Sequence, residues 1–369
     1  MQLFKQETAV RLTGRHLVLA MGLLGSMIIV SSGLAQSADS IGIAPKVPKN
    51  TVITTVTVEP SFAIVVSPDS KTVYVANYFS SSVSVLDATN NYTVKATTSV
   101  GSYPGYLAIS PDGNTLYVSC YANPGTVSVI DTTQSSYPVT ATLTAGVYSE
   151  GLAVTPDGKE LYVTNQGYLS NGIQGTVSVF DTSTNALTTT VATGGAPYLV
   201  VFTDHGKQAD LLNSAGTGYL QFINTVSGKI SSSTGAGGAI FFPDGVVTDS
   251  SASTLYITNE ANYVTVCDAK NGKGNKQFFV SPDIATEMEL GQPAVTPNGK
   301  YMYVSYAYNY LTSSPGNQVV MLDVATGKVV GSPIPVGNDP YWIQMAPNGD
   351  TLYVANERDG TVTVIDTTP

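Results

Sequence analysis

The sequence predicts an all-β protein in which one unit of four short strands is repeated seven times. The first observation is a regular spacing of acids and amides that end the third strand of each unit: Asp87, Asp131, Asp181, Asn224, Asp268, Asp323 and Asp366. The steps between them are 44, 50, 43, 44, 55 and 43 residues. A period in the low forties with several strands per unit is typical of a β-propeller blade. We therefore expect a seven-bladed β-propeller with four-stranded antiparallel blades.

The second observation is a turn that recurs at one place in the unit. Its copies are Ser67-Pro68-Asp69, Ser110-Pro111-Asp112, Thr155-Pro156-Asp157, Thr296-Pro297-Asn298 and Ala346-Pro347-Asn348. Proline presets φ for the second turn position, and the Asp or Asn side chain accepts hydrogen bonds from the following backbone. Units four and five depart from this pattern, since 203–213 aligns with 155–165 but lacks its Pro and Tyr.

Each unit reads in order as an inner strand before the turn, a Tyr-Val strand, a Val-Ser-Val strand and an outer strand such as 137–144. The last unit stops at Pro369, shortly after Asp366, and so lacks its outer strand. A strand-like segment at 51–58 has no unit of its own. Pairing it with 361–366 closes the ring and removes an open sheet edge. We therefore expect one propeller domain over residues 51–369.

The second strands carry a recurrent motif: Tyr74-Val-Ala-Asn77, Tyr117-Val-Ser-Cys120, Tyr162-Val-Thr-Asn165, Tyr256-Ile-Thr-Asn259 and Tyr353-Val-Ala-Asn356. It resembles the YVTN-type β-propeller repeat over nearly all of the chain after residue 50. The resemblance implies a secreted or surface-displayed propeller, related to seven-bladed propellers that include lactonases and a lyase. The motif residues build blades, so the resemblance assigns no site.

The N-terminus has the pattern of a targeting segment. Lys5, Arg11 and Arg15 precede an uncharged run over 17–30, and Gly33-Leu-Ala35 provides a small-residue cleavage site. We expect a signal peptide over 1–35 and a flexible leader over 36–50. The alternative is an uncleaved anchor, because 17–35 carries no charge. Both versions place the propeller outside the cytoplasm, as a periplasmic, extracellular or cell-surface protein.

Charge and cysteine content restrict the partners. The net charge is −10, and removal of 1–35 takes away three bases and one acid, leaving −12. An acidic chain without a Lys/Arg stripe is a poor partner for nucleic acid or an anionic membrane. We expect a monomer with no membrane insertion after cleavage. Cys120 and Cys267 fall in distant blades, so we expect two free thiols.

Histidine is nearly absent, which excludes several chemistries. His16 lies in the targeting segment, and His205 lies in the turn between the first two strands of blade four. Ser-His catalysis, a His-based zinc site and His haem ligation therefore lack their key residue. We assign no catalytic residue, no metal ligand and no cofactor. The repeated strand-end Asp and Asn residues are expected to cap turns.

Function is expected where single blades depart from the repeat. Blades three and six carry extra residues between their second and third strands, at 166–175 and 306–317, with Tyr168, Tyr306 and Tyr308. An insertion before blade six contains Asp283, Glu287 and Glu289. Loops of these two kinds emerge on one face of a propeller. We expect them to flank the mouth of the central channel from two sides.

A second column of residues lies just before the inner strands and is expected at the channel rim: Phe62, Gly105, Glu150, Tyr198, Asp244, Gly291 and Tyr341. Tyrosine offers a stacking face with a polar tip. The combined prediction is a binding face made of Glu150, Tyr168, Tyr198, Asp244, Glu289, Tyr306, Tyr308 and Tyr341. A solvated Tyr-rich surface without a dedicated ligand is the alternative explanation of this pattern.

Two functions remain open. The first is an exported binding module that presents this face to a glycan, peptide or protein. The second is a lactonase-like hydrolase in which rim carboxylates, with Glu150, Asp244 and Glu289 as candidates, hold a divalent cation such as calcium that polarises a carbonyl.

Overall fold

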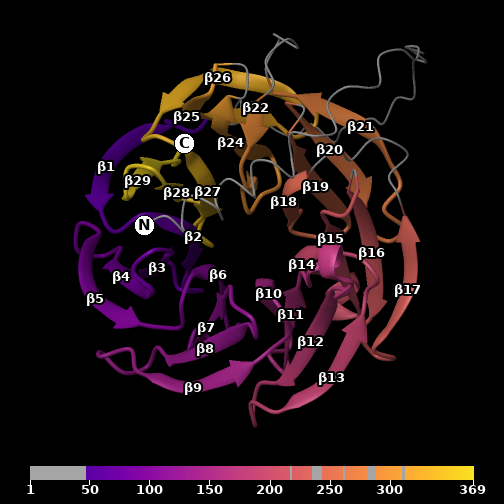
Figure 1. Cartoon of the computed structure of the whole chain (residues 1–369). Helices are drawn as coiled ribbons and strands as arrows, with labels where there is room; N and C mark the ends of the chain where they lie inside the picture. Colours follow the sequence, from indigo (N-terminus) through magenta and orange to yellow (C-terminus); the bar gives the residue numbers. More distant parts are fainter. Residues whose placement is uncertain (1–46, 217, 235–242, 261, 281–287, 310–311) are drawn as a thin grey trace. The chain divides into compact units, whose positions relative to one another are not determined.

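Seven antiparallel sheets follow one another around a central axis (Figure 1). The computed structural model describes residues 47–216, 218–234, 243–260, 262–280, 288–309 and 312–369. The expected signal peptide at 1–35, most of the expected leader, and Asp283 and Glu287 lie outside these residues. The seven-bladed β-propeller with four antiparallel strands per blade is confirmed. No helix among the described residues is long and apolar enough to cross a membrane.

The first three blades run without interruption through residues 61–192. Blade one contains β2 (Ser61–Val66), β3 (Thr72–Asn77), β4 (Ser82–Asp87) and β5 (Thr93–Ser99). Blade two contains β6 (Pro104–Ile109), β7 (Thr115–Cys120), β8 (Thr126–Asp131) and β9 (Val139–Thr144). Blade three contains β10 (Ser149–Val154), β11 (Glu160–Asn165), the 3₁₀ turn η1 (Leu169–Asn171), β12 (Thr176–Asp181) and β13 (Leu187–Ala192).

The remaining blades follow the same order from inside to outside. Blade four contains β14 (Pro197–Thr203), η2 (Asp204–Gly206), β15 (Gln208–Asn213), β16 (Tyr219–Asn224) and β17 (Lys229–Thr234). Blade five contains β18 (Pro243–Thr248), β19 (Thr254–Asn259), β20 (Tyr263–Asp268) and β21 (Gly274–Phe279). Blade six contains β22 (Met288–Leu290), β23 (Ala294–Val295), β24 (Tyr301–Asn309), β25 (Ser314–Asp323) and β26 (Lys328–Pro335). Blade seven contains β27 (Pro340–Met345), β28 (Thr351–Asn356), β29 (Thr361–Asp366) and the N-terminal β1 (Thr51–Thr57).

The expected ring closure is confirmed. Strand β1 pairs antiparallel with β29, from Thr51 opposite Asp366 to Thr57 opposite Thr361. The residues just before β1 are also held, since the Lys49 amide donates to the Thr368 carbonyl at 2.9 Å and the Tyr303 hydroxyl donates to Asn50 Oδ1 at 2.7 Å. Both ends of the domain therefore belong to one sheet.

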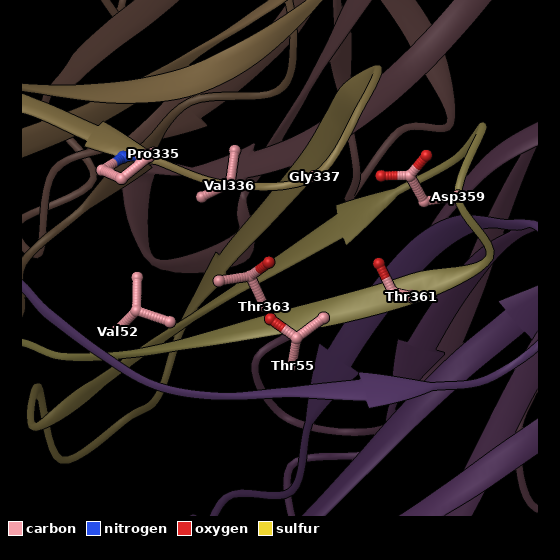
Figure 2. Close-up of a pocket in the computed structure, with 8 residues that line it drawn as sticks. All are labelled: Val52, Thr55, Pro335, Val336, Gly337, Asp359, Thr361 and Thr363. Atoms are coloured by element: carbon pink, nitrogen blue, oxygen red, sulfur yellow. The ribbon is translucent and has the colours of Figure 1, made fainter.

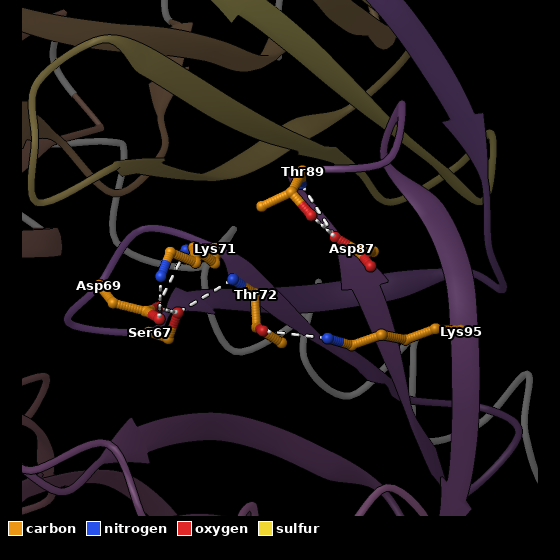
Figure 3. Close-up of polar contacts among 7 residues, drawn as sticks. All are labelled: Ser67, Asp69, Lys71, Thr72, Asp87, Thr89 and Lys95. Carbon is orange, nitrogen blue, oxygen red and sulfur yellow. Dashed lines mark hydrogen bonds and ion pairs between the residues drawn. The ribbon is translucent and has the colours of Figure 1, made fainter.

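The recurrent Pro turns form their own polar network (Figure 3). In blade one the Ser67 hydroxyl donates to Asp69 Oδ1 at 2.6 Å, and the Thr72 amide donates to Ser67 Oγ at 2.9 Å. The acid at the end of β4 does the same for the next turn, because Asp87 Oδ1 accepts from the amide and hydroxyl of Thr89. These bonds show why Ser, Thr and Asp recur at these positions: each satisfies turn backbone that has no ladder partner.

The core lies between neighbouring sheets. Inner, second and third strands are rich in Val, Tyr and Thr and are buried on both faces, whereas outer strands such as β5 expose most of their residues. The repeated tyrosine of the second strand is buried in blades one, two, three, five, six and seven. In blade four Asp210 takes its place, also buried, and accepts hydrogen bonds from Thr203 Oγ1 at 3.0 Å and Gln208 Nε2 at 2.7 Å. Burial raises the pKa of Asp210 to about 7.

Two sequence expectations concern blade six and the cysteines. The segment 306–317 was expected as a loop, and this is wrong for its described part. Tyr306 and Tyr308 lie inside β24, which pairs with β25 in an extended hairpin. The alternating Tyr residues favour strand extension, so the extra length lengthens the ladder. Cys120 and Cys267 are both free and buried in separate sheets, as expected.

Candidate binding face and channel plug

The inner strands of blades one to five and seven share an irregularity near their first residue. In blades one, two, four, five and seven the register of the first two strands shifts after the first residue of the inner strand. The shift leaves one residue unpaired in each, at Phe62, Gly105, Tyr198, Asp244 and Tyr341. A β-bulge of this kind re-aims the extra side chain. Glu150 occupies the same place in blade three, where the shift spans two residues.

Several of these side chains meet together with Tyr106, and we call the group the channel plug: Phe62, Tyr106, Glu150, Tyr198 and Tyr341. The Tyr198 and Tyr341 hydroxyls hydrogen-bond at 2.9 Å although their blades are not neighbours. The ring centroids of Phe62 and Tyr341 are 5.1 Å apart. Tyr198 and Tyr341 are only 6% and 7% exposed, so these contacts between blades that are not neighbours are buried.

Tyr106 belongs to the plug although it was not expected there. Its ring lies 5.4 Å from that of Phe62 and 5.7 Å from that of Tyr198, centroid to centroid. The preceding bulge residue is Gly105, which has no side chain to fill its share of the channel. Blade two therefore contributes the tyrosine that follows. In the sequence, a glycine in this column followed by a large aromatic residue was the feature from which the role of Tyr106 could have been predicted.

The plug is acidic as well as aromatic. Glu150 and Asp244 are 2% and 1% exposed and hold the same inner-strand position in their blades. Burial raises the pKa of Tyr106 well above its usual value, and the neighbouring Tyr198, Glu150 and Tyr341 raise it further. Tyr106 therefore stays a neutral phenol beside Glu150.

The strands expose their loops at two ends, which we name by their connections. The loop face carries the connections between second and third strands and those between successive blades, and the turn face carries the Pro turns. On the loop face, six aromatic side chains over blades one to three form the aromatic arc: Tyr78, Phe79, Tyr103, Tyr121, Tyr148 and Tyr168.

The arc consists of two groups of contacting rings on three neighbouring blades, one made of Tyr78, Phe79 and Tyr103 and the other of Tyr121, Tyr148 and Tyr168. Tyr78 contacts Phe79 and Tyr103, with ring centroids 5.2 and 5.3 Å apart. The Tyr121 amide donates to the Tyr103 carbonyl at 3.0 Å, which joins the second blade's loop to its connector. Tyr121 stacks on Tyr148 with centroids 4.7 Å apart and planes 17° from parallel. Phe79 and Tyr168 at the two ends are 58% and 43% exposed.

Backbone strain accompanies two members of the arc. Tyr103 and Tyr148 both have a φ of 55°, in the left-handed region that bulky residues rarely occupy. A non-glycine residue held there costs of order 1–3 kcal/mol and persists only where its surroundings fix it. Both rings are thereby held at the loop face, each one residue before an inner strand.

The predicted binding residues fall into three groups. Tyr198, Tyr341 and Glu150 lie in the plug, with Asp244 at the equivalent position, and Tyr168 ends the arc. The third group is on blade six, where Glu289 of β22 is paired with Tyr308 of β24. Tyr306 is buried and donates to the Val280 carbonyl at 2.8 Å, so its hydroxyl faces inward. The structure therefore does not bring the blade-six tyrosines together with Tyr168.

A further acid, Asp339, stands near Glu289. Burial raises its pKa to about 6, with a contribution from Glu289 that Arg358 partly offsets. Among the described residues no group of three or more His, Cys, Asp or Glu side chains is placed to hold a metal ion.

A groove of about 520 Å³ lies between blades six and seven beside the closing strand (Figure 2). It is lined by Val52, Thr55, Pro335, Val336, Gly337, Asp359, Thr361 and Thr363. Several of its polar groups already make hydrogen bonds: Thr361 and Thr363 accept from Asn356 Nδ2, and Asp359 accepts from Asn338. The groove is therefore a weaker candidate than the arc or the plug.

Comparison with known proteins adds two findings. No curated protein matches the sequence. Among solved structures, hydrazine synthase of Kuenenia stuttgartiensis is similar, with 22% identity and a TM-score of 0.72, over 84% of this chain and 96% of that chain. At this identity the likeness shows the propeller fold alone. A family model described as arylesterase matches residues 46–172, so the first blades of this chain are similar to that family.

Proposed function

We propose that the protein is an exported binding module that holds a glycan on the aromatic arc of its loop face. The observation that carries the proposal is the gathering of six aromatic side chains, in two groups of contacting rings, over three adjacent blades. Aromatic faces stack on apolar faces of flat ligands, and Tyr adds a hydrogen-bonding hydroxyl at the edge. Rings spread over three blades suit an extended chain of similar units better than one small molecule.

The charge of the loop face restricts the class of ligand further. In the described loops and connectors of the loop face, Arg358 is the single basic residue, whereas the acids are Glu59, Glu260, Asp339, Glu357 and Asp359. An acidic face repels polyanions and attracts cations. We therefore propose a neutral or amino-sugar glycan and exclude acidic polysaccharides.

The test uses purified protein and a panel of neutral, amino-sugar and acidic polysaccharides. Replacing Tyr148 and Tyr168 together by Ala removes one end of the arc. We expect affinity to fall by about 1–3 kcal/mol per lost stacking ring, the magnitude found for aromatic platforms. Phe279→Ala is the matched control, because Phe279 is 50% exposed on outer strand β21. Equal binding by the double variant and the wild type contradicts the proposal.

A second candidate is a lactonase-like hydrolase, favoured by the arylesterase similarity over residues 46–172, which include Glu150. Turnover of aryl esters and lactones is measured with calcium and with a chelator. This function requires saturable turnover that Glu150→Gln and Asp244→Asn each reduce at least tenfold. Turnover that is absent, or unchanged in both variants, rules it out without affecting the glycan test.

A further inference from the structure

One residue beside the start of each outer strand has a left-handed backbone. It comes just before the outer-strand residue that pairs or bonds with the acid or amide closing the third strand. Its φ lies between 48° and 69° in all seven blades. From blade one to blade seven we call these residues the outer-turn column: Tyr92, Tyr137, Asn185, Gly228, Gly272, Gly327 and Asn50. The same backbone turn thus carries different side chains in different blades.

In blades one and two this column places an aromatic ring on the preceding blade. The Tyr92 ring of blade one lies edge to face against Tyr353 of blade seven, with centroids 6.0 Å apart. The Tyr137 ring of blade two lies in the same way against Tyr74 of blade one, with centroids 6.2 Å apart. Tyr353 and Tyr74 are the repeated tyrosines of the second strands. At these two junctions the space beside the repeated tyrosine is therefore filled by a phenol ring.

Blade three has an amide in place of this ring. In blade seven an amide at the same position is satisfied, because Asn50 Oδ1 accepts a hydrogen bond from the Tyr303 hydroxyl of blade six at 2.7 Å. In blade three, Asn185 Oδ1 is buried and has no hydrogen-bond partner among the described residues, so it does not reach Tyr117, the repeated tyrosine of blade two. A buried acceptor left in this way costs free energy, which a bound donor would recover.

A groove of about 300 Å³ occupies this place between blades two and three, at their turn-face end. Tyr117, Val129 and Asp131 of blade two line it on one side, and Thr182 and Asn185 of blade three line it on the other. A cavity of about 150 Å³ is large enough to hold benzene. The groove thus has room for the ring that the two preceding junctions contain and this junction lacks.

We propose that this groove binds a neutral phenol ring, which takes the place that Tyr92 and Tyr137 occupy at the neighbouring junctions. The ring lies against Tyr117, and its hydroxyl donates a hydrogen bond to Asn185 Oδ1. The Asp131 carboxylate in the groove wall disfavours phenolates and aryl carboxylates, because it repels anions. This groove is on the opposite face from the aromatic arc, and the proposal does not depend on the glycan proposal.

The probe is p-cresol, which is the side chain of tyrosine as a free molecule. It is titrated into the purified protein by isothermal calorimetry and by ligand-observed NMR, and we expect saturable binding. Toluene has the same ring without the hydroxyl, so we expect it to bind about threefold to tenfold more weakly, the loss of one hydrogen bond.

A free phenol and the tyrosine side chain of a partner share this chemistry, so N-acetyltyrosinamide is titrated in parallel. Binding at least as tight as that of p-cresol assigns the groove to a tyrosine side chain. Weaker binding than that of p-cresol assigns it to a free phenol.

Two variants at one position test the geometry. Asn185→Tyr supplies the ring from the protein itself, as in blades one and two, so we expect no saturable response to p-cresol and an unfolding temperature at least equal to that of the wild type. Asn185→Gly keeps the left-handed backbone and removes the acceptor, so p-cresol should bind about threefold to tenfold more weakly. Asn91→Gly is the matched control, because Asn91 is exposed in the corresponding turn of blade one with a φ of 51°.

Three outcomes overturn the proposal. The first is a wild type that does not saturate with p-cresol in either measurement. The second is equal affinity of the wild type for p-cresol and toluene, because the hydroxyl would then have no acceptor in the groove. The third is p-cresol binding that Asn185→Gly or a folded Asn185→Tyr leaves unchanged, which would place the ligand elsewhere.

Discussion

The two faces of the propeller are built from the same strands but follow opposite rules. On the turn face, blades one, two, three and six repeat one network, in which a Ser or Thr hydroxyl donates to the Asp or Asn two residues later at 2.5 to 2.7 Å. On the loop face, the described connections differ in sequence from blade to blade. The turn face thus satisfies the turn backbone in a similar way in four blades, whereas the loop face varies without disturbing the fold.

The comparison also separates two kinds of repeated amide or acid. Asn165, at the loop end of β11, is fully buried, and its side chain makes five hydrogen bonds to neighbouring elements. The turn acids, such as Asp87, are half-buried and bond within their own turn. Repetition alone therefore does not measure the contribution of a residue to stability.

The largest effect is expected from removing the closing strand. Deletion of residues 1–57 leaves β29 with an unpaired edge and removes the β1 ladder. We expect the free energy of unfolding to fall by more than about 4 kcal/mol, or the protein to aggregate. Deletion of residues 1–46 is the control, because it retains Lys49, Asn50 and β1. Equal melting temperatures of the two proteins would show that the ring does not need this strand.

A smaller loss is expected from Asn165→Ala. The change removes donors to Thr176 and Ser178 and leaves the Gly146 amide without its acceptor. We expect a destabilisation of about 2–4 kcal/mol in urea unfolding, because a buried partner is left unsatisfied. Asn114→Ala, in an exposed turn on the other face, should cost less than about 1 kcal/mol. A larger loss of stability for Asn114→Ala than for Asn165→Ala would contradict this difference between the two faces.

The smallest effects are those of pH, and they have opposite signs in two parts of the molecule. Hydrogen bonds lower the pKa of Asp87, Asp131 and Asp181, so these acids stabilise the fold above about pH 4 and this contribution is lost as the pH falls. The raised pKa of Asp210, about 7, means that its contribution is complete below about pH 4 and is lost as the pH rises through 7.

Urea unfolding at pH 3, 5 and 8 distinguishes the two effects. Asp210→Asn should gain stability relative to the wild type between pH 5 and pH 8. For the triple variant Asp87→Asn, Asp131→Asn and Asp181→Asn, the rise in the free energy of unfolding from pH 3 to higher pH should be smaller than for the wild type. Parallel pH profiles for the wild type and Asp210→Asn would show that Asp210 ionises normally.

The period and the turns were sufficient to predict the blades, their order and the closing strand. The column Phe62, Glu150, Tyr198 and Tyr341 was also found from the sequence, but it was expected at the rim and is buried. Its depth depends on how far bulges from several blades lean inward, which spacing does not specify. The arc was recognised only at Tyr168, because Tyr78, Tyr121 and Tyr148 lie in connections of ordinary length.

The closing strand has a consequence for biosynthesis. Thr51 is synthesised before all six blades that separate it in the sequence from its partner Asp366. Each of blades one to six is built from consecutive strands, whereas β1 can pair only after β29 has been synthesised. Because pairing over such a sequence separation forms slowly, β1 remains without this partner until late in folding. Its Thr-rich composition, with polar residues at 51, 54, 55 and 57, suits a strand that must stay soluble before it is used.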